Sequence, residues 1–488
     1  MKCQSETSTA TDGVLRSVDR EEEPLTWMFW RKRRYFVVMM VHLGYIANYS
    51  MRVNLSVAIV EMTKNRTIQY EDGTSGNEQY FNWNSQERGI ILSSFYWGYI
   101  CTQIVGGFLS KRFGGNLIFG LGIGLTAVLT LLIPWLGKTV VAIVVIRVLQ
   151  GLCEGVTFPC IHDVWLFWAP IPERSRMASI GVSGMLVGTV ISLPISALLA
   201  TSLGWESIFY VFGGLGILWH ITWAIFVRSS PAQDSYISKD ELDYIQNNVS
   251  IADETTRIVP WKSLLTSRAV YAITAAHITD NWGFYTLITQ MPSFLNDALH
   301  YNLESSGLLS AIPYLCMSIS IPIAGILADV LQNKKLLTTT QVRKYFNCGA
   351  FTIQMVCMLM AGFLVHRLWS VLLIIVGVGI GGFTLTSYSI NPLDIAPAYA
   401  SLILGISNTF ATLPGIISPA LTGYLVQNQT IDEWRIVFYI AASVYVFGIV
   451  VYWFWCSGEL QPWSVSGARR DNEIRTKASR KVTDQVSD

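Results

Sequence analysis

Three charged residues lie inside long apolar stretches and are the first candidates for chemistry. Arg52 interrupts one stretch, and Arg147 and Glu154 interrupt another. A charged side chain at the centre of a bilayer costs roughly 2.5 to 3.5 kcal/mol on insertion scales. Because this cost means that a buried charge in a membrane segment is usually functional, we interpret the three residues as candidates for one functional group.

The spacing of Arg147 and Glu154 places them on one side of a helix. Seven residues make two helical turns, so both side chains share a face with Gln150 between them. Guanidinium groups offer paired donors to a carboxylate or a phosphate, so Arg52 and Arg147 suit an anionic substrate. Glu154 could then carry a proton or respond to a coupling cation, since substrate that neutralises a neighbouring arginine changes the balance between its charged and neutral forms. The alternative is that Arg147 and Glu154 pair only to lower the cost of insertion.

Four further residues are candidates for lining a cavity. His162 lies eight residues beyond Glu154 on nearly the same face, where an ordinary interfacial histidine is the competing interpretation. His277 and Asp280 lie three residues apart in a later apolar stretch, and Tyr285 follows in the same stretch. These three could approach the site from the second half of the chain, with Tyr285 as a substrate-binding residue.

The composition identifies the kind of protein that must position these side chains. The chain has 488 residues, of which 51% are apolar and 14% are charged, against roughly 25% charged in an average soluble protein. The 34 basic and 33 acidic residues nearly cancel, so nucleic-acid binding is not supported. Neither a phosphate-binding loop nor a Cys or His cluster with metal spacing occurs. We therefore expect a membrane protein that is not an enzyme and needs no cofactor beyond a coupling ion, Na⁺ or H⁺.

Stretches of about 20 apolar residues predict twelve membrane-spanning helices. The predicted spans are 35–60, 89–110, 116–136, 139–166, 177–203, 208–227, 269–297, 304–330, 343–366, 369–393, 399–427 and 434–456. The fold class is thus an all-α polytopic membrane protein. Its predicted parts are an N-terminal tail (1–34), a six-helix bundle (35–227), a central loop (228–268), a second six-helix bundle (269–456) and a C-terminal tail (457–488).

The two predicted bundles resemble each other in sequence. Gly107-Phe-Leu-Ser-Lys-Arg112 after the second span corresponds to Gly325-Ile-Leu-Ala-Asp-Val330 after the eighth. Trp205-Glu-Ser-Ile-Phe-Tyr210 at the start of the sixth span corresponds to Trp434-Arg-Ile-Val-Phe-Tyr439 at the start of the twelfth. Parallel repeats of this kind enclose a site at their interface near the bilayer midplane, and one half rocks against the other.

Loop charges predict the orientation. With the N-terminus inside, the inner short loops and their flanks hold twelve Lys and Arg residues against six in the outer connections, so both termini are predicted to be cytoplasmic. The glycosylation sequons at Asn65 and Asn428 then lie outside, while Asn248 lies in the central loop and stays unmodified.

The sequence resembles the anion:cation symporter family of the major facilitator superfamily, from about Tyr35 to Trp463. The similar stretches are Arg52-Val-Asn-Leu-Ser-Val-Ala58, Phe95-Tyr-Trp-Gly-Tyr-Ile-Cys-Thr-Gln-Ile-Val-Gly-Gly107, Gly151-Leu-Cys-Glu-Gly-Val-Thr-Phe-Pro159, Trp168-Ala-Pro170 with Glu173-Arg-Ser175, Gly188-Thr-Val-Ile-Ser-Leu-Pro194 and Ser457-Gly-Glu-Leu-Gln-Pro-Trp463. The resemblance implies the major facilitator fold and secondary active transport of anions. It also implies that Arg52 and Arg147 bind substrate and that Glu154 couples transport to a cation.

Departures from the family pattern narrow the expected substrate. Leu92 and Asp280 stand where the vesicular glutamate carriers of the family have a histidine and an arginine, and an added acid would repel a dianion. Gln150 stands where sialic acid carriers have a glutamate. We expect transport of inorganic phosphate or small organic anions, coupled to Na⁺ or H⁺, with an uncoupled, voltage-driven facilitator or a channel-like anion pathway as the alternative. We also expect a monomer, in the plasma membrane rather than a lysosomal or vesicular one.

Overall fold

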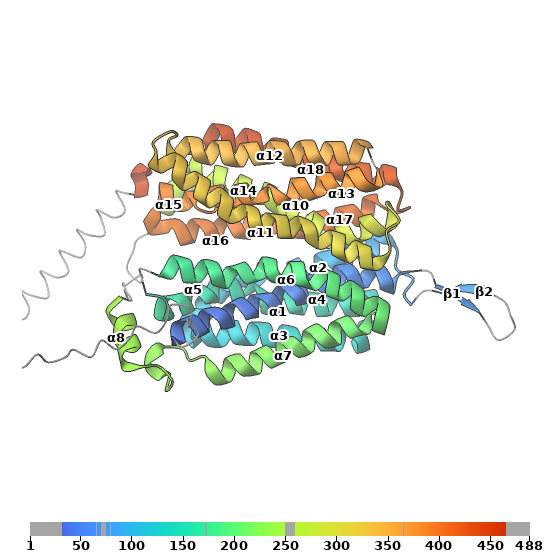
Figure 1. The fold of residues 1–488 in the computed structure, drawn as a ribbon, viewed down its shortest axis with the longest axis horizontal. Coiled ribbons are helices and arrows are strands. Elements are labelled where there is room, and N and C mark those ends of the chain that lie inside the picture. Colours follow the sequence, from blue (N-terminus) through green and yellow to red (C-terminus); the bar gives the residue numbers. More distant parts are fainter. Residues whose placement is uncertain are drawn as a thin grey trace, which may run out of the picture.

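Two bundles of long helices lie side by side along their whole length (Figure 1). The computed structural model describes residues 32–64, 66–69, 75–78, 80–170, 173–248, 259–364 and 366–464. The predicted glycosylation site Asn65 and most of both predicted tails lie outside these ranges.

The first bundle, called the N-bundle below, contains seven helices. Asn84 and Glu87 form a capping box that starts α2, and the side chain of Thr139 caps α4. Helices α4 and α5 together make one span that is interrupted at Val156. The helices are α1 (Arg33–Met62), α2 (Ser85–Phe113), α3 (Gly115–Leu136), α4 (Val140–Gly155), α5 (Thr157–Trp168), α6 (Arg174–Leu203) and α7 (Glu206–Phe226).

The second bundle, called the C-bundle below, is more often interrupted. Helices α13, α14 and α15 make one span that breaks at Ile380 and again after Tyr388. The helices are α10 (Arg268–Asp297), α11 (Leu303–Asn333), α12 (Thr339–Leu364), α13 (Arg367–Gly379), α14 (Gly381–Tyr388), α15 (Asn391–Ile395), the short helix η4 (Pro397–Tyr399), α16 (Ala400–Ala411), α17 (Leu413–Leu425) and α18 (Ile431–Trp455).

The predicted all-α membrane fold is confirmed. Nine spans in the described ranges are long and apolar enough to cross a membrane, and α1, α2 and α10 bring the number to twelve. These three helices are also long enough to span a membrane, but their polar residues lower their mean hydropathy. They carry Arg52, Tyr99 and Asp280, whereas Arg147 and Glu154 lie in one of the nine apolar spans, Val140–Trp168. Within the described ranges, the one departure from an all-α structure is a small antiparallel hairpin, β1 (Arg66–Gln69) with β2 (Ser75–Glu78).

The two ends of the molecule differ. At one end, called the hairpin end, lies the hairpin of β1 and β2. At the other, called the α8 end, lies the segment between the bundles, with η2 (Pro231–Gln233), α8 (Lys239–Asn248) and α9 (Trp261–Leu265). The start of α1 contacts α8 through Glu241, and Trp463, beyond α18, packs against the hydrophobic cluster that includes Leu264 of α9, so both ends of the described chain lie at the α8 end.

A group of charges, called the N-clamp, ties the segment after α7 to the start of α1. Arg33 pairs with Asp234 at 2.8 Å. Arg34 pairs with Glu173 at 2.9 Å and with Glu241 at 3.1 Å. Burial tends to raise the pKa of Glu173, but the hydrogen bond and charge of Arg34 outweigh it and hold that pKa below its ordinary value.

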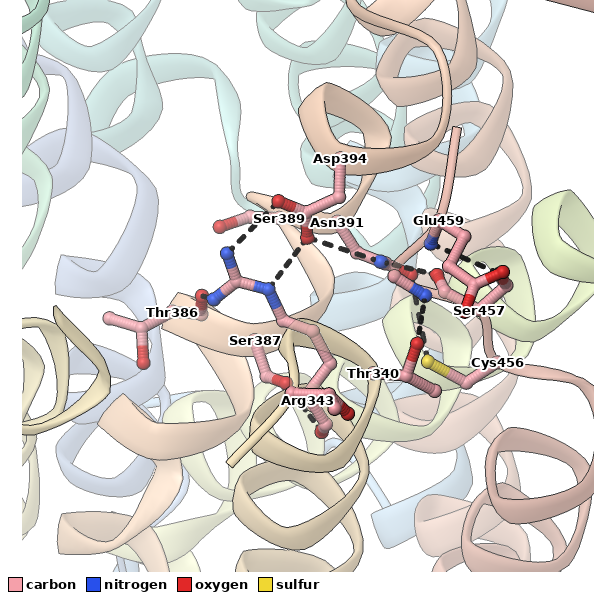
Figure 2. Close-up of polar contacts among 12 residues, drawn as sticks. Thr340, Arg343, Thr386, Ser387, Ser389, Asn391, Asp394, Cys456, Ser457 and Glu459 are labelled. Carbon is pink, nitrogen blue, oxygen red and sulfur yellow. Dashed lines mark hydrogen bonds and ion pairs between the residues drawn. The ribbon is translucent and has the colours of Figure 1, made fainter. Parts of the chain in front are cut away.

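A corresponding group, called the C-clamp, ties the segment after α18 to the C-bundle (Figure 2). Arg343 donates from Nε to Asp394 at 2.8 Å, and Asn391 donates to the carbonyl oxygen of Ser457 at 2.8 Å. The backbone N–H of Gly458 donates to Thr340 at 2.9 Å. In each bundle, the chain that leaves the last helix is thus bound to helix ends of the same bundle.

The bundles meet most closely toward the hairpin end. A Cβ on Gly89 of α2 would lie 2.5 Å from the carbonyl oxygen of Pro419 in α17, so the two backbones are in contact there. Hydrogen bonds or ion pairs between the bundles lie at the following pairs: Arg88 with Asp297, Thr201 with Glu304, and Gln103 with Asn408 and Thr412. Within the described ranges, no hydrogen bond or ion pair between the bundles lies closer to the α8 end than those of Gln103. Apart from the Gln103 contacts, which lie past the middle of α2, these contacts between the bundles gather toward the hairpin end, so we take that end as the closed side of this conformation.

Candidate functional site

Arg52 and Glu154 form a buried ion pair within the N-bundle. The guanidinium donates to Oε2 of Glu154 from Nη2 at 2.8 Å and from Nε at 3.1 Å. Both side chains are almost fully buried, at 4% and 1% exposure. Arg52 lies 19 residues beyond the start of α1, and Glu154 lies 14 residues into the span that begins at Val140. The helices meet here because α1 and α4 run through the same bundle in opposite directions.

Arg147 lies next to this pair but has no carboxylate partner in the described part of the chain. Its Nη1 donates to Gln150 at 3.0 Å, and its Nη2 donates to the carbonyl oxygen of Arg52 at 3.2 Å. Gln150 in turn donates to Thr130 at 2.8 Å. Arg147 is 2% exposed, and its Nε is buried without a hydrogen-bond partner, as is Nη1 of Arg52. Two buried guanidinium groups thus retain unused N–H donors side by side.

Aromatic rings enclose both guanidinium groups. The Phe95 ring centroid lies 4.8 Å from Cζ of Arg52 and 4.9 Å from Cζ of Arg147. Tyr49 and Tyr99 lie 4.5 and 4.7 Å from Cζ of Arg52. Ring faces attract cations, so the aromatic residues hold the positive charges where water does not solvate them. This role was not expected from the sequence, although the aromatic stretch Phe95-Tyr-Trp-Gly-Tyr99 was the feature that could have indicated it.

Glycines allow α2 and α4 to come close enough for these contacts. A Cβ on Gly98 would lie 2.7 Å from the backbone nitrogen of Leu152, and one on Gly151 would lie 2.8 Å from that of Tyr99. Small residues at helix crossings let backbones approach closely in membranes. Phe95 and Tyr99 are thereby pressed against the polar face of α4.

Tyr285 approaches the group from the C-bundle. Its ring centroid lies 4.6 Å from that of Tyr96 on α2, and Tyr285 is buried. Because Tyr96 is adjacent to Phe95, Tyr285 lies beside the wall of the arginine site across the interface between the bundles.

His277 and Asp280 belong to a second polar group, inside the C-bundle. Asp280 contacts the hydroxyl of Thr384 at 2.6 Å and accepts a hydrogen bond from Tyr388 at 3.3 Å. Nδ1 of His277 lies 3.1 Å from the hydroxyl of Ser407, and its ring lies 4.9 Å from that of Tyr388. The sequence analysis predicted neither Thr384 nor Tyr388, which lie just after the glycine-rich run of α13 and α14.

Two other predicted residues lie away from both groups. His162 is an exposed residue of α5, eight residues beyond Glu154, and its ring packs 5.5 Å from that of Phe158. Asn428 is exposed at the hairpin end, and its amide donates to Glu433 at 2.8 Å beside the start of α18. Its glycosylation stays a prediction.

The arrangement is suited to holding an anion rather than to bond-breaking chemistry. Arg52 and Glu154 cancel in charge, so the buried group of the N-bundle carries one net positive charge from Arg147. Spare guanidinium donors in a site that excludes water bind an anion strongly, because charge-assisted hydrogen bonds are the stronger kind. Groups of three or more His, Cys, Asp or Glu residues able to hold a metal ion are not found among the described residues.

Comparisons with known proteins agree with this description. Residues 41–419 match the family model described as Major Facilitator Superfamily. Vesicular glutamate transporter 3 of Danio rerio is 40% identical over 443 residues, which are 89% of this chain and 75% of that protein. Vesicular glutamate transporter 1 of Xenopus laevis is 39% identical over 445 residues, 89% of this chain and 77% of that protein. Vesicular glutamate transporter 2 of Homo sapiens is 38% identical over 461 residues, 93% of this chain and 79% of that protein.

A solved structure shares the fold. A bacterial homologue of the human lysosomal transporter Spinster, described as inward-facing and occupied, aligns with a TM-score of 0.67 at 12% sequence identity. The alignment covers 86% of this chain and 96% of that one. With its twelve spans and its similarity to transporters over nine-tenths of its length, the chain is a transporter of the major facilitator superfamily and belongs to the anion:cation symporter family that includes the vesicular glutamate transporters.

Proposed function

We propose that this transporter carries a small anion, an organic carboxylate or inorganic phosphate, which binds between Arg52 and Arg147. Tyr285 contacts the anion from the C-bundle, and Gln150 keeps Arg147 in position. The relatives named glutamate transporters favour the organic carboxylate.

The observation that carries this proposal is the state of Arg147. A buried charge without a counter-ion is strongly destabilising unless a binding partner supplies one. Arg147 is 2% exposed, and among the described residues its hydrogen bonds go only to the Gln150 amide and the backbone carbonyl of Arg52. An anion would supply the missing charge, so the group is expected to be most stable when occupied.

The charges of the site favour a monovalent anion. Arg52, Arg147 and Glu154 sum to one positive charge, and a monovalent anion neutralises it completely. While Glu154 is ionised, a dianion would leave a net negative charge in a buried site, and it would be neutralised only if Glu154 took up a proton. Glutamate, whose net charge at neutral pH is −1, and the monovalent form of phosphate both satisfy this condition.

Glu154 is proposed as a coupling acid. An anion that binds Arg52 competes with Glu154 for the same N–H donors, and a displaced carboxylate in a buried site is stabilised by taking up a proton. The coupling ion would then be H⁺. A dependence of uptake on Na⁺ alone would contradict this role.

Uptake into liposomes tests the proposal. The purified full-length chain is reconstituted, and radiolabelled L-glutamate and inorganic phosphate are supplied separately under imposed proton, sodium and voltage gradients. We expect saturable uptake of at least one probe, driven by the proton gradient and reduced about 100-fold or more in Arg147→Gln, since charged hydrogen bonds contribute about 1.5–3 kcal/mol each.

Arg367→Gln is the matched control, because Arg367 is an exposed arginine at the hairpin end. Uptake should be unchanged in this variant. Equal uptake by wild type and Arg147→Gln, or no uptake above protein-free liposomes for either probe, would contradict the proposal. Uptake that follows voltage alone, with no cation requirement, would identify an uncoupled facilitator instead.

The cellular address and orientation are also proposed. We infer that the α8 end faces the cytoplasm, as the loop charges predict, which places both termini there. The relatives are named as vesicular proteins, so we infer a vesicular membrane in place of the plasma membrane that we expected from the sequence. Surface biotinylation of cells expressing the tagged chain, beside imaging of the tag, separates these two addresses.

A further inference from the structure

Asp280 is a buried carboxyl group of the C-bundle for which the proposed anion site has no use. It lies 12 residues into α10, which is near the middle of that 30-residue helix, and is 6% exposed. In the described part of the chain it has no ion-pair partner, whereas Glu154 is held by Arg52. A carboxylate taken out of water without a counter-ion is costly, so such a group takes up a proton instead.

The hydrogen bonds around Asp280 indicate where that proton lies. The hydroxyl of Thr384 is 2.6 Å from Oδ1 of Asp280 and 2.7 Å from the carbonyl oxygen of Gly381. A hydroxyl has one hydrogen, yet a carboxylate and a carbonyl can only accept. With Asp280 ionised, one of these two short contacts would have no hydrogen. With Asp280 protonated, Asp280 donates to Thr384, Thr384 donates to Gly381, and both contacts are satisfied.

We propose that Asp280 is a second proton-carrying carboxyl group, which is protonated in this conformation with the hairpin end closed and releases its proton during the transport cycle. The inference rests on the proposed function, since a cycle of anion transport is what the proton would drive. It adds a proton site in the C-bundle to the coupling role of Glu154 in the N-bundle. The reaction is the reversible transfer of one proton between Asp280 and water, and no bond to the anion is formed.

Among the titratable neighbours of Asp280, His277 is the one whose ordinary pKa also lies near neutral pH. The other titratable groups that face Asp280 are tyrosines, which are neutral near pH 7 when unperturbed. Of the charged residues on the packed helices, Arg52 of α1 pairs with Glu154 and Asp394 of α15 pairs with Arg343. Those of α11 and α18 lie in the end turns of their helices: Glu304, Asp329, Asp432, Glu433 and Arg435. The hydroxyls of Ser407 on α16 and Ser418 on α17 contact His277 and Thr286 of α10. The titratable neighbours are His277 on α10, Tyr388 on α14 and Tyr445 on α18, and Tyr314 of α11 lies near Tyr445.

Side chains that can relay the proton extend toward the α8 end. Tyr388 bonds to Asp280, and its ring lies 4.9 Å from the ring of His277. His277 is one helical turn nearer the α8 end than Asp280 and is only half-buried. Because the closed side of the structure is the hairpin end, proton exchange is expected through His277 on the α8 side.

Infrared difference spectroscopy tests the protonation of Asp280 without any substrate. A protonated carboxyl group has a C=O stretching band that a carboxylate lacks. We expect the purified full-length chain to show this band at pH 7, and we expect Asp280→Asn to lose it. Asp432→Asn is the matched control, because Asp432 is a highly exposed acid at the hairpin end, and it should keep the band. A band that persists unchanged in Asp280→Asn would overturn the inference.

Transport assays in liposomes test the coupling. With L-glutamate or inorganic phosphate as the probe, we expect Asp280→Asn to keep exchange of labelled for unlabelled anion across the membrane. Accumulation driven by a proton gradient should fall about tenfold, within the usual range of coupling between sites. Asp280→Glu should restore part of the accumulation. Proton-driven accumulation at the wild-type level in Asp280→Asn would contradict a proton-carrying role.

Thr384 offers a second, milder variant. Thr384→Val removes the hydroxyl that bonds to Asp280 at nearly constant volume, and Thr384→Ser keeps it. We expect the pH dependence of exchange to shift in the valine variant and to match wild type in the serine variant. If Arg147→Gln left anion flux intact, the proposed anion site would be wrong, yet the infrared band would still report on Asp280, so the two failures are distinguishable.

Discussion

The two bundles hold their buried charges in different ways. In the N-bundle, three charges lie together and two of them cancel, with aromatic rings around both guanidinium groups. In the C-bundle, Asp280 lies among hydroxyl groups and has no counter-ion in the described residues. An excess positive charge suits an anion, and an isolated carboxyl group suits a proton. From this difference we propose that the C-bundle adds a proton site to the anion site and the coupling acid of the N-bundle.

The largest expected effect comes from removing the unpaired charge of the N-bundle. Arg147→Gln should reduce anion transport about 100-fold or more while leaving the free energy of unfolding unchanged or higher, because the buried cation has no counter-ion to lose. Uptake into liposomes and thermal unfolding in detergent measure the two effects. A variant that unfolds much more readily than wild type would show that Arg147 is structural instead.

The second prediction compares the carboxyl groups of the two bundles. Glu154→Gln leaves Arg52 buried without its partner and should destabilise the protein by about 3–5 kcal/mol. The double variant Arg52→Gln with Glu154→Gln should recover most of this loss. Asp280→Asn replaces a neutral acid by a neutral amide and should change stability by about 1 kcal/mol or less. Thermal unfolding in one detergent compares all three, and a large loss in Asp280→Asn would contradict its neutral state.

The third prediction concerns the contact that holds the two halves together at the hairpin end. Gly89→Leu places a side chain against Pro419 and Gly423, where even a Cβ has no room. We expect it to shift the equilibrium toward a conformation open at the hairpin end. The equilibrium constant should change about tenfold for each 1.4 kcal/mol that the steric clash costs the closed conformation. Hydrogen exchange at the hairpin ends of α2 and α17 should then rise. Gly107→Leu is the control on the same helix, since nothing lies within 4 Å of a Cβ there.

The smallest effect is expected at the N-clamp. The pKa of Glu173 is held below its ordinary value by Arg34, although burial opposes this. The stabilisation is therefore complete above the ordinary pKa of about 4.3 and is lost as the pH falls through the lower, folded-state pKa. Hydrogen exchange in α8 should rise below about pH 4, and Glu173→Gln should abolish this pH dependence. Exchange that rises equally in both proteins would assign the effect to another group.

The positions of the twelve spans could be read from the sequence with errors of a few residues. A helix in lipid must satisfy its backbone polar groups internally and needs about 20 apolar residues, so length and hydropathy suffice to find it. The prediction that Arg147, Gln150 and Glu154 share a helix face also follows from spacing alone, and the structure brings them together with Arg52. The hairpin of β1 and β2 lies in a polar connection, where hydropathy carries no information.

The sequence did not reveal which partner each charge would take. Spacing suggested Arg147 as the partner of Glu154, but Glu154 is bonded to Arg52 of another helix. Likewise, Thr384 and Tyr388 lie more than 100 residues from Asp280 along the chain. The sequence by itself determined the membrane fold, the family and the residues of costly charge, because these depend on local composition and spacing. The tertiary structure alone decided which charge is paired and which is isolated, because that depends on how helices distant in sequence pack against one another.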